Sequence, residues 1–192
     1  MPAAKPGERK LQILQTLAEM LEAPAAERIT TAALAAKLDV SEAALYRHFA
    51  SKAQMFEGLI EFIEQTVFGL VNRIQAEERD AMKQIEGTIA TLLGFAQKNP
   101  GMTRVLIGDA LVNEDERLQS RVNQLLDRLE ASLRQSARLA VSAGTFPSDW
   151  DVNAYANAVL AYVIGRWHQF AKSGFKRGPM DGWPQQWRVF AA

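Results

Sequence analysis

Along most of the chain, hydrophobic residues recur every three or four positions, which is the spacing of one face of an α-helix. This pattern predicts helices over 8–22, 81–98 and 117–143, and a helix of about six turns that runs from 52 to 74. No alternating stretch followed by a tight turn indicates a pair of strands. The sequence therefore predicts an all-α fold of about nine helices.

Prolines mark two interruptions of the helical pattern. Residues 1–7, which contain two prolines and a glycine, are predicted to form a mobile tail. Pro24 is predicted to end the first helix, and 25–27 to form a link. Further along, Asn99 is the expected N-cap of a helix that reaches about residue 112, with Pro100 at its first position.

The last quarter of the chain is more apolar than the rest. Gly144 is expected to end one helix, and Ser148 or Asp149 to begin the next. That next helix is apolar on several faces, so it needs more than one neighbour to cover it. A segment with several glycines, 173–183, is predicted to be a loop, and 185–192 a last short helix.

A stretch near the N-terminus combines two brief helices with a tight turn. Thr30 or Thr31 is predicted to cap the first helix, Asp39 lies in the turn, and Ser41 is predicted to cap a second helix over 42–48. Two short helices joined in this way form the helix-turn-helix, whose second helix enters the major groove of DNA. From spacing alone, the stretch fits an αα-corner in a small three-helix core equally well.

This stretch is predicted to have its own core and to lead directly into the long helix that starts near residue 52. Leu45 and Phe49 are the expected core residues under the second short helix. Ser51 and Gln54 match a capping box for the start of the long helix.

Charge alone does not indicate nucleic acid as a partner. The chain has 22 Lys and Arg residues against 22 Asp and Glu residues, and residues 1–60 contain seven of each kind. A neutral segment has little nonspecific attraction for phosphates. Any role in DNA binding therefore depends on where individual side chains lie.

Other classes of function leave no signal in the sequence. The chain has no cysteine, which excludes disulfides, thiol nucleophiles and Cys-ligated zinc. Its two histidines, His48 and His168, match no metal-ligand spacing, and no phosphate-binding or nucleophile-elbow motif is present. We therefore expect no catalysis, no cofactor and no metal. The absence of a signal peptide and of a run of about 20 apolar residues predicts a soluble, cytoplasmic protein.

Residues 41–49, SEAALYRHF, together with Lys52 and the pair Met55-Phe56, closely resemble the N-terminal signature of TetR-family regulators. The resemblance covers residues 8–75. One departure is Asp39, which stands where the family usually has glycine. Because aspartate tolerates a left-handed backbone better than most residues, we expect a small stability cost and the same fold.

The TetR resemblance also implies how the chain is divided and which residues contact DNA. It implies a DNA-binding domain over 1–52 and a helical dimerisation and partner-binding domain over 53–192. By position in the motif, Ala43 and Ala44 would pack on thymine methyl groups, and Arg47 would reach a base or a phosphate. For His48, packing in the core is as well supported as a phosphate contact. The residues implied for DNA binding are Thr30, Thr31, Ser41, Glu42, Ala43, Ala44, Tyr46, Arg47, His48 and Lys52.

Most of the chain further resembles the nucleoid-occlusion members of the TetR family, through residues 29–64, 92–111, 117–135 and 173–187. Proteins of this branch are homodimers that bind palindromic chromosomal sites. While on DNA, they bind the division protein FtsZ and prevent Z-rings from forming over the nucleoid. The resemblance implies dimerisation through the last two helices. It also implies an FtsZ-binding surface made of Phe62, Leu70, Gly94, Lys98 and Asn99.

Two points stay open at the level of the sequence. Phe62 lies beside the main apolar stripe of its helix, so ordinary core packing is as well supported for it as a partner contact. The chain also fits a ligand-responsive TetR-type transcriptional repressor, with an effector pocket lined by Tyr155, Tyr162, Trp167 or Phe95.

Overall fold

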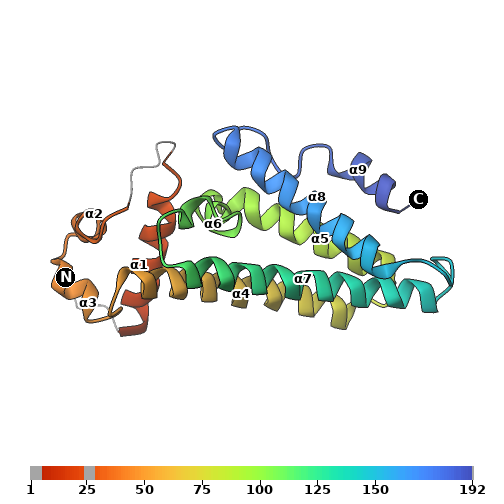
Figure 1. Cartoon of the computed structure of the whole chain (residues 1–192), viewed down its shortest axis with the longest axis horizontal. Helices are drawn as coiled ribbons and strands as arrows, with labels where there is room; N and C mark the ends of the chain where they lie inside the picture. The colour runs from red at the N-terminus through yellow and green to blue at the C-terminus, as the bar shows by residue number, and fades with distance from the viewer. Residues whose placement is uncertain (1–5, 24–28, 192) are drawn as a thin grey trace. The chain divides into compact units, whose positions relative to one another are not determined.

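The computed structural model describes residues 6–23 and 29–191, and within these ranges the chain forms nine α-helices, one 3₁₀ helix and no strand (Figure 1). The all-α prediction is therefore confirmed. The elements are α1 (Pro6–Met20), α2 (Thr31–Lys37), α3 (Glu42–Tyr46), α4 (Lys52–Glu77), α5 (Ala81–Lys98), α6 (Pro100–Leu106), η1 (Asp109–Leu111), α7 (Glu116–Ser142), α8 (Val152–Lys172) and α9 (Trp183–Phe190).

Several predicted boundaries are confirmed, and the first part of the chain is described incompletely. α5 covers the predicted range 81–98, and α7 is shifted by one residue from its predicted range. α1 begins at Pro6, so residues 6 and 7 do not belong to the predicted tail. The rest of that tail, over 1–5, and the predicted break and link over 24–27 lie outside the described residues.

Other helix ends were predicted wrongly, each for a local reason. α6 ends at Leu106 rather than near 112, since Gly108 adopts a left-handed φ of 77° before η1. α8 is capped by Asp151, whose carboxylate accepts hydrogen bonds from the Asn153 and Ala154 amides at 2.9 and 3.0 Å. The predicted caps, Ser148 and Asp149, therefore precede the helix. α3 also ends two residues before the predicted end at residue 48, and α9 begins at Trp183, earlier than expected.

The chain divides into two compact units. The first contains the described residues up to Ile63 and those from Asn99 to Val122. Within it, α1 packs on α2 and α6, α2 packs on α3, and α6 packs on η1. Leu45 and Phe49 are buried there, as predicted. The other large core side chains of this unit include Ile13, Leu17, Leu34, Phe56, Leu59, Ile60 and Val105.

Inside the first unit, α6 approaches the end of α1 at very short range. A Cβ atom on Gly101 would lie 1.9 Å from the carbonyl oxygen of Ala18. The guanidinium of Arg104, with its side chain 12% exposed, donates to the carbonyls of Leu21 at 3.1 Å and Ala23 at 3.2 Å. The last carbonyls of α1 accept from the amides of residues 21–23, whereas those of Leu21 and Ala23 lie just beyond the helix. Arg104 therefore ties the turn that follows α1 to α6.

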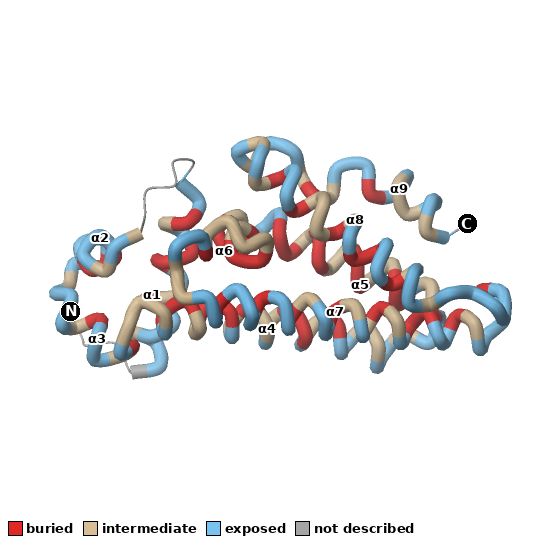
Figure 2. Tube along the Cα trace, viewed as in Figure 1, coloured by how far each residue is buried: buried red, intermediate tan, exposed pale blue. Residues whose placement is uncertain are grey.

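The second unit contains Glu64–Lys98 and the described residues from Asn123 onward, and in it α5 packs on α8. Buried stretches alternate with exposed ones along α5, α7 and α8 (Figure 2). Trp167 of α8 is buried, and its indole N–H donates to the carbonyl of Leu92 at 3.2 Å. The predicted inner face of α5 is fully buried and consists of Ile85, Ile89, Leu92, Leu93 and Ala96.

Aromatic packing attaches α9 to α8. The ring of Tyr162 lies 4.9 Å from that of Phe190, and the Tyr155 hydroxyl donates to the Phe190 carbonyl at 3.0 Å. Burial raises the pKa of Tyr155 to about 12. Although α8 is apolar on several faces, none of the described helices is both long and apolar enough to cross a membrane.

Candidate nucleic-acid interface

The N-terminal end of α2 is fixed by a threonine cap. Thr30 Oγ1 accepts a hydrogen bond from the Ala33 amide at 3.1 Å, which does not use the proton of the Thr30 hydroxyl. The next residue, Thr31, directs its hydroxyl to the carboxylate of Glu42 at 2.6 Å. Of the two threonines, Thr30 is therefore the one whose hydroxyl proton stays available for an external acceptor.

The turn between α2 and α3 is held by the paired hydrogen bonds that commonly end helices. The Asp39 amide donates to Ala36 O at 3.1 Å, and the Val40 amide donates to Ala35 O at 3.0 Å. This arrangement requires a left-handed residue after the C-cap, and Asp39 supplies it with a φ of 54°. Aspartate thus occupies the glycine position of the motif in the expected conformation.

α3 presents one face to the core and the other to solvent. Ser41 caps the helix, with Oγ accepting from the Ala44 amide at 3.3 Å. Leu45 is 1% exposed and anchors the helix on the core of the first unit. The side chains left on the outer surface of α3 and its C-cap are Glu42, Ala43, Tyr46 and Arg47, with Ala44 half-buried.

Three polar side chains connect α2 to α3. Tyr46 OH donates to Thr31 Oγ1 at 3.4 Å, and the Thr31 hydroxyl in turn donates to Glu42 Oε2. Tyr46 and Glu42 are one helical turn apart, so both can reach Thr31 from the same side of α3. The chain of donors fixes the direction of the Glu42 carboxylate on the exposed face.

The residues that follow α3 differ in accessibility. Arg47, at the C-cap, is exposed, so its guanidinium can meet a base or a phosphate. His48 is half-buried. Next to it, the buried ring of Phe49 carries the ammonium of Lys10 at 5.6 Å from its centroid.

The start of α4 carries the predicted cap and an ion pair that the sequence did not indicate. The Gln54 amide donates to Ser51 Oγ at 3.1 Å, whereas the Gln54 side chain accepts from the Ala50 amide at 2.9 Å, one residue before the usual capping-box partner. Lys52 forms an ion pair with Glu114, and the two side chains are 22% and 12% exposed. Any phosphate that binds Lys52 would therefore compete with this carboxylate.

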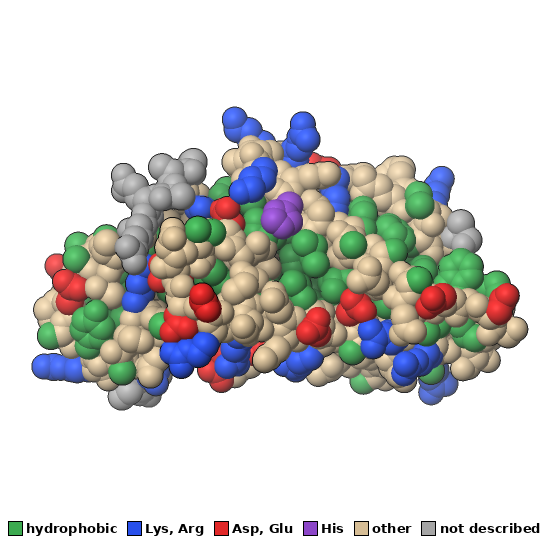
Figure 3. Space-filling view, viewed as in Figure 1, with side chains coloured by type: hydrophobic (Ala, Val, Ile, Leu, Met, Phe, Trp, Pro, Cys, Tyr) green, Lys and Arg blue, Asp and Glu red, His purple; other side chains and the backbone are tan. Residues whose placement is uncertain are grey.

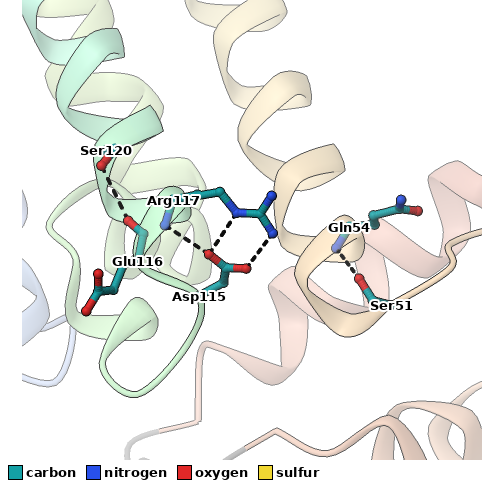
Figure 4. A network of polar contacts seen from close by, with 6 residues as sticks. All are labelled: Ser51, Gln54, Asp115, Glu116, Arg117 and Ser120. Atoms are coloured by element: carbon teal, nitrogen blue, oxygen red, sulfur yellow. Dashed lines mark hydrogen bonds and ion pairs between the residues drawn. The ribbon is translucent and has the colours of Figure 1, made fainter.

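A second acidic residue shapes the segment before α7. The Arg117 guanidinium donates two hydrogen bonds to the Asp115 carboxylate, at 3.1 and 2.7 Å (Figure 4). The Arg117 amide also donates to Asp115, at 3.0 Å. These bonds, led by the side-chain ones, lower the pKa of Asp115 to about 2. The segment that holds Glu114 beside Lys52 is thus fixed locally.

The five residues expected to meet FtsZ belong to different units. Phe62 and Asn99 lie in the first unit, and both are half-buried. Leu70, Gly94 and Lys98 lie in the second, where Lys98 is exposed in the last turn of α5. A Cβ on Gly94 would meet nothing within 4 Å, so this position of α5 faces open space.

The aromatic residues considered for an effector pocket pack against other parts of the second unit. Tyr155 lies 5.0 Å from Phe146 between ring centroids, and Tyr162 OH donates to Gln186. Trp167 and Phe95 are 1% and 7% exposed. The second unit has an open hollow of about 330 Å³, and its lining contains none of these four residues: it consists of Ile74, Glu77, Glu78, Lys83 and Gly87.

The sequence did not predict the supporting residues that lie far along the chain from the helix-turn-helix. Glu114 is 62 positions from Lys52, so no local spacing signals the pair. Gly101 and Arg104 reach α1 across a similar gap in sequence. In the sequence, these residues are marked only by the Asn-Pro-Gly start of α6. That pattern indicates where a helix begins and does not predict its contact with α1.

Comparison with known proteins identifies the family to which this helix-turn-helix belongs. Residues 13–59 match a family model described as bacterial regulatory proteins of the tetR family. Residues 79–192 match a model of the SlmA-like type, described as a tetracyclin repressor-like C-terminal domain. A TetR transcription regulator from Haloarcula marismortui has the same fold, with a TM-score of 0.81 and 16% identity over 96% of this chain and 97% of that one.

Relatives of known role are similar over nearly the whole chain. The nucleoid occlusion factor SlmA of Alteromonas mediterranea is 49% identical over 190 residues, which are 99% of this chain and 97% of that protein. The nucleoid occlusion factor SlmA of a Marinomonas species is 50% identical over 188 residues, 97% of this chain and 95% of that protein. The resemblance to the nucleoid-occlusion branch over 29–64, 92–111, 117–135 and 173–187 is thereby confirmed, and the tetR-family match over 13–59 confirms the one carried by 41–49. With its capped helix-turn-helix and two matching family models, the chain belongs to the SlmA family of nucleoid occlusion factors, built on the TetR-type fold.

Proposed function

We propose that the protein is a sequence-specific DNA-binding nucleoid-occlusion factor that binds FtsZ as a DNA-bound homodimer and blocks Z-ring assembly over the chromosome. It acts in the cytoplasm, on the nucleoid. The observation that carries the proposal is α3, a short helix capped by Ser41, anchored through Leu45, and exposed along Glu42, Ala43 and Tyr46. Relatives of about half-identical sequence are named nucleoid occlusion factors, which supports the same role here.

The DNA-binding residues fall into two groups by chemistry. Thr30, His48 and Lys52 carry hydroxyl, ring N–H or ammonium groups suited to phosphates, and phosphate contacts set position without reading sequence. Tyr46 donates its hydroxyl proton to Thr31 and therefore supports the group that reads bases. The residues on the exposed part of α3 are suited to base edges, and they are Ser41, Glu42, Ala43, Ala44 and Arg47. Thr31 joins the second group through its hydrogen bond to Glu42. Residues 1–52 are the DNA-binding domain in this proposal, and 53–192 the dimerisation and partner-binding domain.

Dimerisation through α8 and α9 is supported by the small side chains on the exposed surface of α8. Ala154, Ala158 and Ala161 are exposed at helical spacing, and the Val189 side chain of α9 is 76% exposed. Hydrophobic side chains gather along α8 in the view of Figure 3. Small apolar residues on one helical face allow two copies of that helix to approach closely, and an isologous dimer uses the same surface on both chains.

The DNA half of the proposal is tested by selecting from a pool of random duplexes with the purified protein. We expect a palindrome, because a symmetric dimer presents two copies of α3 to two half-sites about one helical turn apart. Enrichment of no sequence, or of a single unrepeated half-site, would reject sequence-specific binding by a dimer.

The FtsZ half is tested by light scattering of FtsZ polymers in the presence of the protein. We expect the selected duplex to increase the loss of polymer caused by the protein, while a scrambled duplex of equal length leaves it unchanged. An FtsZ signal that is the same with and without the protein and its DNA site would refute the division role. DNA binding without any effect on FtsZ would favour a transcriptional repressor.

A further inference from the structure

We infer that Glu42 determines base specificity by accepting a hydrogen bond from the exocyclic amino group of a cytosine in the major groove, and that Thr31 and Tyr46 hold its carboxylate in position. This inference rests on the proposed DNA-binding function and names one base that α3 would recognise. It starts from the chain of hydrogen bonds between α2 and α3, in which the Thr31 hydroxyl donates to Glu42 Oε2 at 2.6 Å.

A carboxylate on the DNA-facing side of a helix is unfavourable unless it finds a donor. Phosphates repel it, and every acceptor on a base edge does the same. Glu42 is exposed at the first position of α3, where base edges come within reach once the helix lies in the groove. The donors in the major groove are the amino groups of cytosine and adenine.

Cytosine fits a carboxylate better than adenine does. Beside its amino group, adenine presents the N7 acceptor, which would face a carboxylate oxygen across the groove. Cytosine has a carbon at the corresponding position and therefore opposes no acceptor to it. Glutamate paired with the cytosine amino group is the combination that this geometry favours, whereas glutamine suits the donor and acceptor pair of adenine.

The contacts of Glu42 within the protein orient its carboxylate for one base. One Thr31 hydrogen bond engages Oε2 and leaves acceptor capacity on the carboxylate, which has about four lone-pair sites. Tyr46 OH donates to Thr31 Oγ1 at 3.4 Å, which turns the Thr31 proton toward Glu42. A side chain that is oriented before binding loses less entropy on contact, so its preference among bases is sharper. Thr31 and Tyr46 are positioning residues in this scheme.

The test is selection from random duplexes with the wild type and with Glu42→Ala, Glu42→Gln, Thr31→Val and Tyr46→Phe. Thr31→Val keeps the branched shape and removes the donor. In the wild type we expect one fixed cytosine in each half-site, preferred roughly tenfold over other bases. Glu42→Ala should lose that preference and keep the rest of the site, and Glu42→Gln should move it to adenine. Thr31→Val should weaken only the preference for cytosine at that position. Tyr46→Phe should weaken the same preference.

Thermal melting and the dimer mass of each variant show whether it is folded. An unchanged site for Glu42→Ala overturns the inference, because the carboxylate then reads no base. Loss of all sequence preference in folded Glu42→Ala and Thr31→Val also overturns it, since the pair would then serve only to hold α2 and α3 together. If the wild type itself selects no sequence, the proposed DNA-binding function fails, a result distinct from either of these.

Discussion

A Cβ atom placed on Gly101 would lie 1.9 Å from the carbonyl oxygen of Ala18, so α6 lies directly against the backbone of α1 at this glycine. The obstructing atom belongs to the backbone and cannot rotate away. We therefore expect Gly101→Ala to force α6 off α1 and to lower the free energy of unfolding by about 3 kcal/mol, at the upper end of overpacking effects. Urea denaturation at 25 °C measures this loss.

Gly69→Ala is the matched control for Gly101→Ala. Gly69 lies in the exposed part of α4, and a Cβ there would meet nothing within 4 Å. Replacing glycine by alanine inside a helix should raise stability by roughly 0.5–1 kcal/mol. If both variants lose stability equally, the approach of Gly101 to α1 is not what limits the substitution.

Lys52 and Glu114 allow a phosphate contact to be separated from a structural one. Lys52→Ala should weaken DNA binding about equally for all sequences and reduce the slope of log affinity against log salt by about 1 per protomer. Glu114→Gln should preserve or raise DNA affinity, because it releases the Lys52 ammonium from its partner. Each change leaves one mostly buried charge of the pair without its partner, so each should lower the free energy of unfolding by roughly 1–3 kcal/mol.

Fluorescence anisotropy with a labelled duplex at several salt concentrations distinguishes the two roles. A salt slope that is the same for the wild type and for Lys52→Ala would show that Lys52 does not meet a phosphate. In that case its ion pair with Glu114 would account for its position at the start of α4.

Local chemistry in the sequence was sufficient to predict most of this fold. Ser41 caps α3, Asp39 takes the left-handed position, and α5 spans its predicted range, because each depends on neighbours within one helical turn. The helix ends that were predicted wrongly involve a choice between adjacent candidates. Asp151 and Asp149 look alike in sequence, and only the observed hydrogen bonds from the Asn153 and Ala154 amides identify the cap.

In the candidate site too, the features set by local sequence could be predicted, and those set by the packing of helices could not. The residues of α2 and α3 could be named from a motif, whereas the bond from Thr31 to Glu42 could not, because it depends on the angle between two helices. The partners Glu114 and Lys52 lie 62 positions apart, and that pairing is set by the packing of the whole first unit. A single sequence carries no signal for such contacts.

Tyr155 predicts how stability changes at alkaline pH. Burial raises its pKa from 10 to about 12 in the folded state, so the folded state favours the protonated hydroxyl that donates to the Phe190 carbonyl. The stability gained from this is fully present below pH 10 and is lost as pH rises toward 12. Tyr155→Phe removes the donor and should cost about 1 kcal/mol near neutral pH.

Urea denaturation of both proteins between pH 9 and pH 11.5 checks this assignment. The stability of the wild type should fall more steeply above pH 10 than that of Tyr155→Phe, and absorbance at 295 nm should report the same tyrosine. Parallel curves for the two proteins would mean that Tyr155 titrates normally and does not link α9 to α8.

Lys98 tests the proposed FtsZ surface without touching α3. Lys98→Glu should leave DNA affinity within about twofold and reduce the effect on FtsZ polymers at least tenfold, since a reversed charge repels a partner that the lysine attracts. The substitution also places a carboxylate in the last turn of α5, where the helix dipole opposes it by roughly 0.3–1 kcal/mol. Lys98→Gln removes the charge without that penalty and should show an intermediate effect.

Lys83→Glu is the control at the other end of the same helix. Lys83 is exposed in the first turn of α5, where the dipole favours a negative charge, so the variant should be stable and should keep both activities. Light scattering of FtsZ with the selected duplex compares the three variants. If Lys83→Glu and Lys98→Glu reduce the effect equally, the partner responds to the net charge of α5 and not to a surface at Lys98. If Lys98→Glu loses DNA binding as well, misfolding explains the variant, and only Lys98→Gln can then report on the FtsZ surface.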